Sequence, residues 1–92
     1  MSWIVKMSPK AQKSYGSLPK KVKDQVQFLM GDIEQNGPVR GDWPNYGKIG
    51  KNRHHCHLKK GHPTYVAVWA EYADGVRIAE IEYVGTHERA PY

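Results

Sequence analysis

The residues best suited to chemistry lie in one short segment, where histidines and cationic side chains occur together without any acidic residue. Histidine titrates near neutral pH, so it can act as an acid or a base, and it is also a common metal ligand. Lysine and arginine bind phosphate groups. The segment contains Lys48, Lys51, Arg53, His54, His55, His57, Lys59, Lys60 and His62. We therefore expect it to bind an anionic ligand beside groups that can transfer protons.

We expect residues 53–59 to form a strand, in which successive side chains point to opposite faces of the sheet. Cys56 and Leu58 then share one face with His54, and these two apolar side chains predict that this face meets the core, with Cys56 as a small buried residue. A single bulge would invert part of the alternation. The opposite face is expected to carry His55, His57 and Lys59.

Three interpretations of His55 and His57 are open. They are exposed polar residues without a task, a pair of metal ligands completed by His62 or His87, or an acid and a base beside a phosphate site. The polar segment after the last expected strand favours the third interpretation, because it can bring further functional groups to the same face. We therefore expect no metal ion and no cofactor. The groups in that segment are His87, Arg89 and Tyr92.

The elements that position these residues follow from helix capping and hydrophobic periodicity. Ser8 and Pro9 predict a helix start, and Gly37 followed by Pro38 predicts a helix end. An apolar stripe at helical spacing comprises Val22, Val26, Leu29, Met30 and Ile33. We expect a strand at 3–7, a short helix from residue 9, a break at 16–19, a second helix ending near residue 36, a loop at 41–51, and strands at 53–59, 64–71 and 76–84.

The order strand, helix, helix, strand, strand, strand predicts an α+β fold, with a small, mainly antiparallel, twisted sheet and both helices on one face. With 92 residues and a formal net charge of +5, residues 1–92 are expected to form a single domain, too small for a doubly wound nucleotide-binding fold or a TIM barrel. The mean hydropathy of −0.74 argues against a membrane span. The single cysteine, Cys56, is typical of a cytoplasmic protein.

Several motifs resemble the RelE/ParE superfamily of bacterial toxin–antitoxin toxins, in an order and spacing that cover nearly the whole chain. Residues 81–89 (IEYVGTHER) are similar to the family's closing strand, glycine and basic residue. Residues 56–58 (CHL) and 65–69 (YVAVW) resemble its central hairpin, above all in the YafQ-like branch, where histidines take catalytic roles. The resemblance implies the RelE-like microbial RNase fold.

The resemblance also implies a function. Such toxins cleave translated mRNA in the ribosomal A site and so inhibit translation and growth, and a small antitoxin neutralises them in a hetero-oligomer. The expected partners are therefore a cognate antitoxin, mRNA and the ribosome. Cleavage without a metal ion needs a base for the 2′-OH proton, cations at the phosphoryl oxygens and an acid for the leaving 5′-oxygen.

For this chain we assign His57 as the general base and His87 as the general acid, with the reverse assignment open. His87 falls where RelE toxins carry a catalytic arginine, and Tyr92 resembles the family's base-stacking tyrosine. The supporting residues are Lys59 and Arg89 at the phosphate and His55 as an orienting or substitute group. The residues expected to hold RNA are Lys48, Lys51, Arg53, Lys60 and Tyr92, with Trp43 and Tyr46 as alternatives for base stacking.

Three other functions stay open on sequence grounds. They are a ParE-like toxin that inhibits DNA gyrase by binding alone, an RNA-binding module without catalysis, and an inactive remnant that still binds an antitoxin. The histidine-rich segment favours RNA cleavage, because inhibition by binding needs no acid–base groups.

Overall fold

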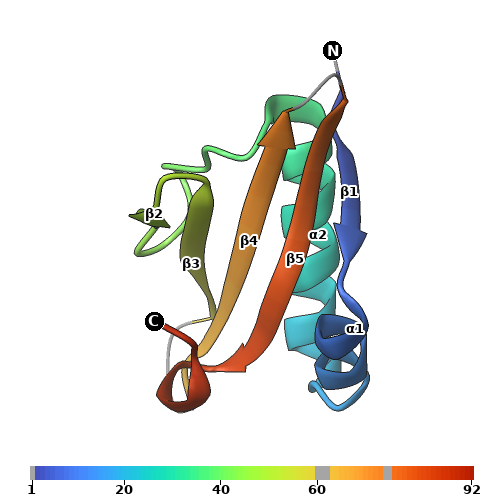
Figure 1. Cartoon of the computed structure of the whole chain (residues 1–92). Coiled ribbons are helices and arrows are strands. Elements are labelled where there is room, and N and C mark those ends of the chain that lie inside the picture. The colour runs from blue at the N-terminus through green and yellow to red at the C-terminus, as the bar shows by residue number, and fades with distance from the viewer. Residues whose placement is uncertain (1, 60–62, 74–75) are drawn as a thin grey trace.

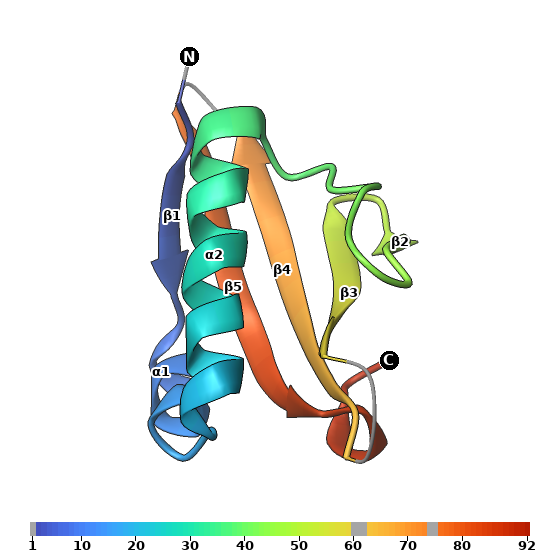
Figure 2. The same ribbon diagram turned by 180° about the vertical axis from the view of Figure 1, so that it is seen from behind.

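The structure is a computed structural model that describes residues 2–59, 63–73 and 76–92. The chain forms one five-stranded sheet (Figure 1), and two helices cover one of its faces, as the reverse view shows (Figure 2). The elements are β1 (Ile4–Met7), α1 (Pro9–Gly16), α2 (Lys20–Asn36), β2 (Gly47–Gly50), β3 (Arg53–Lys59), β4 (Tyr65–Ala73), β5 (Arg77–Thr86) and the one-turn 3₁₀ helix η1 (His87–Arg89). The predicted α+β fold is confirmed.

The strands lie in the order β1-β5-β4-β3-β2. The pairings among β2, β3, β4 and β5 are antiparallel, whereas β1 pairs in parallel with β5, with Ile4 opposite Ile78 and Met7 opposite Ile81. The mainly antiparallel sheet is therefore as expected. No helix in the described part of the chain is long and apolar enough to span a membrane.

Capping and the apolar stripe explain the two helices. The side chain of Ser8 accepts a hydrogen bond from the backbone N–H of Ala11 at 3.1 Å and so caps α1. Helix α2 ends at Gly37, whose φ of 93° favours glycine. The residues of α2 that are buried against the sheet are Val22, Val26, Leu29 and Ile33.

The predicted alternation along β3 is confirmed from His54 to Leu58, whereas the side chain of Lys59 lies outside the described residues. His54, Cys56 and Leu58 are buried on the helix-covered side, whereas His55 and His57 are half-buried on the other face. Burial raises the pKa of the Cys56 thiol to about 12, which fits a core residue rather than a nucleophile. The register of the β3–β4 pairing shifts only after His57, so the irregularity does not disturb this part of the strand.

Residues 47–50 form β2, so the prediction of a loop across the whole of 41–51 was wrong. Gly47 lies opposite His55, and Lys48 lies opposite His54. The sequence shows no sign of this strand because four residues with two glycines carry no alternating apolar pattern, and the strand depends on its pairing with β3. A Cβ added at Gly47 would lie 3.1 Å from Nε2 of His55, so this glycine allows β2 to approach the imidazole closely.

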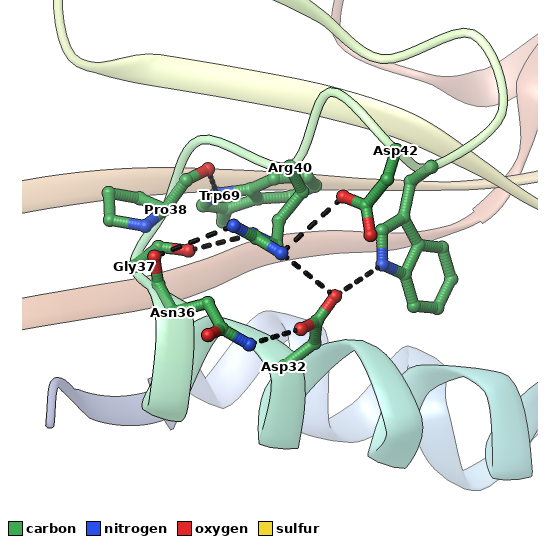
Figure 3. A network of polar contacts seen from close by, with 8 residues as sticks. Asp32, Asn36, Gly37, Pro38, Arg40, Asp42 and Trp69 are labelled. Atoms are coloured by element: carbon green, nitrogen blue, oxygen red, sulfur yellow. Dashed lines mark hydrogen bonds and ion pairs between the residues drawn. The ribbon is translucent and has the colours of Figure 1, made fainter.

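A network of polar contacts ties the loop after α2 to that helix (Figure 3). Asp32 accepts hydrogen bonds from Nε1 of Trp43 at 2.9 Å and from Arg40 at 3.1 Å. Burial raises the pKa of Asp32, but hydrogen bonds from its neighbours and the charge of Arg40 outweigh this effect, so the pKa lies below its usual value. Beyond Trp43 the loop passes beside β3, where the carbonyl of Pro44 accepts a hydrogen bond from the backbone N–H of His57 at 2.8 Å.

Candidate functional site

Four aromatic rings meet on the side of the sheet that the helices leave open, and we call His55, His57, His87 and Tyr92 the imidazole cluster. The ring centroids of His57 and His87 lie 5.5 Å apart, and those of His55 and Tyr92 lie 4.5 Å apart. His87 and Tyr92 also meet edge to face, with their centroids 6.0 Å apart. The structure thus brings together, from β3, η1 and the segment after η1, residues that the sequence analysis selected separately.

Backbone hydrogen bonds fix the turn that carries His87. The backbone N–H of His87 donates to the carbonyl of Thr64 at 2.8 Å, which ties η1 to the start of β4. One residue earlier, the carbonyl of Thr86 accepts a hydrogen bond from the hydroxyl of Tyr83 at 2.7 Å. His57 is held independently through β3, so both imidazoles are placed by hydrogen-bonded backbone.

His57 and His87 border a cleft with a volume of about 290 Å³. The side chains around it are His57, Pro63, Thr64, Thr86, His87 and Glu88. A larger groove of about 710 Å³ adjoins the cleft at Thr86, which lines both, but none of the three histidines of the cluster lines the groove. Of these two hollows, the smaller is therefore the one that imidazoles border.

The electrostatics of the cluster favour neutral imidazoles. Burial lowers the pKa of His55, and the neighbouring His57 and His87 lower it further. Burial also lowers the pKa of His57, again with help from His87. Two imidazoles that are neutral near pH 7 can accept protons, which is the state that a general base requires.

His55 has a further unusual feature. Its Nδ1 atom is buried and has no hydrogen-bond partner among the described residues, while its Nε2 faces Gly47 and its ring lies against Tyr92 at an interplanar angle of 32°. A buried polar atom without a partner costs free energy unless a ligand, a water molecule or an ion satisfies it. The orphaned nitrogen therefore marks His55 as a residue whose polar contacts are incomplete in the free protein.

The described cations assigned to RNA binding differ in their surroundings. Lys48 and Lys51 are exposed and free to contact a polyanion. Arg53 instead pairs with Glu82, with 3.0 Å between Nε and Oε1, so part of its charge is already balanced. Lys48 and Lys51 are thus better placed than Arg53 to attract a phosphate backbone.

The remaining assigned cations are not seen beside the two imidazoles in the described part of the chain. Arg89 is exposed and lines the larger groove rather than the cleft between the two imidazoles. Lys60 and the side chain of Lys59 lie outside the described residues. Within the described ranges, no group of three or more His, Cys, Asp and Glu side chains is arranged to hold a metal ion.

His54 is fully buried, and its buried polar and aromatic partners were not predicted from the sequence. Its Nδ1 lies 2.6 Å from the hydroxyl of Tyr46, its Nε2 lies 2.5 Å from Oε2 of Glu71, and its ring stacks on Trp69. Tyr46 is therefore occupied within the protein, as is Trp43 through its bond to Asp32, and neither is free to stack on a base. The available signal was a histidine on a predicted core face, because such a residue needs buried partners.

Comparisons with known proteins bear on the fold. No protein-family model matches the sequence, and no curated protein matches it. The archaeal RelE–RelB complex from Pyrococcus horikoshii OT3 aligns with a TM-score of 0.68 at 16% identity, over 98% of this chain and 100% of that chain. A free E. coli RelE toxin with two arginine-to-alanine substitutions aligns with a TM-score of 0.72 at 16% identity, over 98% of this chain and 88% of that chain. The chain has the fold of the RelE toxins, as its motifs predicted.

Proposed function

We propose that the protein is the toxin of a toxin–antitoxin pair and that it cleaves RNA without a metal ion. The observation that carries the proposal is that His57 and His87 border one cleft, although they lie far apart in the sequence. The fold supports the toxin part of the proposal, since one similar structure is a RelE toxin and the other is a RelE–RelB complex. The proposed substrate is mRNA under translation in the ribosomal A site, in the cytoplasm, and its cleavage would stop translation and growth.

In the proposed reaction His57 removes the proton of the ribose 2′-OH, and the 2′-oxygen attacks the adjacent phosphorus in line. The lowered pKa of His57 supports this role, because the imidazole is then unprotonated near pH 7. His87, protonated, donates to the leaving 5′-oxygen as the P–O bond breaks. The products are a 2′,3′-cyclic phosphate and a 5′-hydroxyl, which balances the two proton transfers.

His55 and Tyr92 are proposed to hold the nucleotide beside the cut. Their neighbouring rings, with centroids 4.5 Å apart, offer an aromatic surface for a base, and the stacking of one base on such a ring contributes about 1–3 kcal/mol to binding. Lys48 and Lys51 would hold the backbone of mRNA or ribosomal RNA.

The partner that restrains the toxin is proposed to be an acidic antitoxin. A net charge of +5 and a cationic segment beside the cleft suit an acidic chain that orders on binding. One of the similar structures is a complex of RelE with RelB. Copurification of the chain with the product of an adjacent gene, at a fixed ratio, tests this part of the proposal.

Cleavage is tested with the variants His57→Ala and His87→Ala. Each is expected to lower the cleavage rate by about 10²–10⁴-fold, the usual contribution of one acid or base, while the circular dichroism spectrum is unchanged. Primer extension on translated mRNA after brief induction measures the cuts in cells. With purified ribosomes, cleavage is expected to fail on mRNA with a 2′-deoxy residue at the cut site, because the 2′-oxygen is the proposed nucleophile.

The pH profile is the sharper measurement. A base and an acid that titrate in opposite senses produce a bell-shaped dependence of kcat/KM on pH, and each single variant is expected to lose one limb. Full toxicity of both histidine variants would refute the assignment. Trapped gyrase–DNA complexes without cut mRNA would instead support the ParE-like alternative.

A further inference from the structure

The larger groove has no role in the reaction described above. It lies between α1 and the end of β5 and has a volume of about 710 Å³, within the range of ligand sites. The polar residues that matter around it are Lys10, Ser14, Ser17, Tyr65, Thr86 and Arg89. Two cations and several hydroxyl groups are suited to an anion with many acceptor atoms.

The charge of this groove is uncompensated. Lys10 and Arg89 are exposed, and neither forms an ion pair with a described acidic residue. Glu82 is the acidic residue among those lining the described groove, and it already pairs with Arg53 at 3.0 Å. The groove therefore presents two free positive charges to a ligand.

The groove and the cleft lie side by side and share Thr86 in their walls, and this arrangement points to a polymer. Thr86 lines both, and the single turn η1 follows it directly. From that turn, His87 borders the cleft while Arg89 borders the groove. A chain whose phosphodiester lies between His57 and His87 can therefore continue past Thr86 into the groove.

We propose that Lys10 and Arg89 bind the RNA phosphate next to the one that is cut. This inference rests on the proposed function and deepens it, because it makes the groove a subsite for the adjoining nucleotide. Arg89 then contributes to substrate binding rather than to the chemical step. Its contribution depends on the length of the RNA, since a dinucleotide in the cleft does not reach the groove.

The test compares a single-stranded RNA that spans both hollows with a dinucleotide, each carrying a 2′-deoxy residue at the cut site so that neither is cleaved. Fluorescence anisotropy of the labelled long RNA, and competition by the dinucleotide, measure the two affinities. Lys10→Ala and Arg89→Ala are each expected to weaken binding of the long RNA about tenfold, as the loss of one charged hydrogen bond does. Each is also expected to reduce the slope of log K against log salt by about one.

Matched controls come from the same elements. Lys13→Ala changes another lysine of α1 and Arg77→Ala changes an arginine at the start of β5, and neither residue lines the groove. Both controls are expected to leave the affinity for the long RNA within about twofold, since they remove the same charge without removing a contact. All four variants are expected to bind the dinucleotide as the parent does.

Several outcomes would overturn the inference. Unchanged affinity of both Lys10→Ala and Arg89→Ala for the long RNA is one. Equal losses with the dinucleotide are another, because Arg89 would then act at the cut phosphate. An acidic peptide that binds the parent but not the variants, with RNA binding unaffected, would assign the groove to a protein partner.

Cleavage by the parent, measured in parallel, separates failure of this inference from failure of the proposed function. If the parent cuts mRNA, the proposed function stands whatever the groove variants do. If the parent neither cuts nor binds RNA, both the proposed function and this inference fail.

Discussion

The position of His87 depends on the hydroxyl of Tyr83. That hydroxyl donates to the carbonyl of Thr86 at 2.7 Å, immediately before His87. Gly85 is required beside it, because a Cβ at this position would lie 2.7 Å from the same oxygen. We therefore expect Tyr83 to be a positioning residue, which acts on the proposed cleavage through the turn rather than by touching the substrate.

Tyr83→Phe removes this hydrogen bond and keeps the ring. We expect the cleavage rate to fall about 10–100-fold, since small displacements of a catalytic group are costly, and the alkaline limb of the pH profile, which reports the general acid, to change together with it. Gly85→Ala is expected to have a similar effect because its methyl group displaces the hydroxyl, and the double variant is expected to be no worse than the more affected single variant.

Single-turnover cleavage over a range of pH measures these effects, with the exposed Tyr72→Phe as the control. If Tyr83→Phe cleaves as the parent does at every pH, the turn does not depend on the hydroxyl. A fall in thermal stability without a change in the rate would assign Tyr83 a structural role only.

At the level of single residues, the sequence predicts which side chains share a face of a strand, but not which distant residues they contact. The pleat of residues 53–59 was sufficient to separate His55 and His57 from His54, because alternation is a local property. The partners of His54 were out of reach, since Glu71 is 17 residues away and the contact depends on how β3 and β4 align. The sequence predicted that His57 and His87 lie close together, but it did not predict the contact between the rings of His55 and Tyr92.

At the scale of elements, Asp32 joins α2 to the loop that reaches β3. The carboxylate is mostly buried, at 16% exposure, and Arg40 beside it is at 15%. We expect Asp32→Ala to lower the free energy of unfolding by about 1–3 kcal/mol, because it removes charge-assisted hydrogen bonds and leaves Trp43 and Arg40 without their acceptor.

Urea denaturation measures this change, and Asp24→Ala is the matched control. Asp24 lies on the same helix and pairs with Lys20, but the two side chains are 63% and 87% exposed, so the control is expected to lose no more than about 0.5 kcal/mol. Equal losses in the two variants would show that the loop does not depend on Asp32.

This network also explains why the loop was harder to predict than the helices. The stripe of α2 repeats every three or four residues and identifies the helix by itself. The segment from Gly37 to Gly50 is ordered instead by contacts with α2 and β3. Strand β2 forms because it pairs with β3, and no pattern within the four residues of β2 predicts this pairing.

At the scale of the whole molecule, the buried imidazoles make stability depend on pH. Burial holds the pKa values of His55 and His57 below the ordinary value of 6.5. Below that value the unfolded chain binds more protons than the folded chain, so protonation favours unfolding. The stabilising contribution is therefore complete above about pH 6.5 and is lost as the pH falls towards the pKa values of the folded state.

We expect the midpoint of urea unfolding to fall between about pH 7 and pH 5, and to fall less in the double variant His55→Gln, His57→Gln. The pKa of Asp32 is also lowered, so the double variant is expected to keep a small pH dependence of stability at the acidic end of this range. An identical pH dependence in parent and double variant would show that the two imidazoles titrate alike in the folded and unfolded chain.

The parallel pairing of β1 with β5 has a consequence for biosynthesis. Residues 4–7 are made long before their partners, residues 78–81, so the contact joins distant parts of the nascent chain and contributes to a high contact order. During vectorial synthesis the first strand stays unpaired until the last one emerges, and His87 follows later still. The contact of His57 with His87 can therefore form only after β5 has been synthesised.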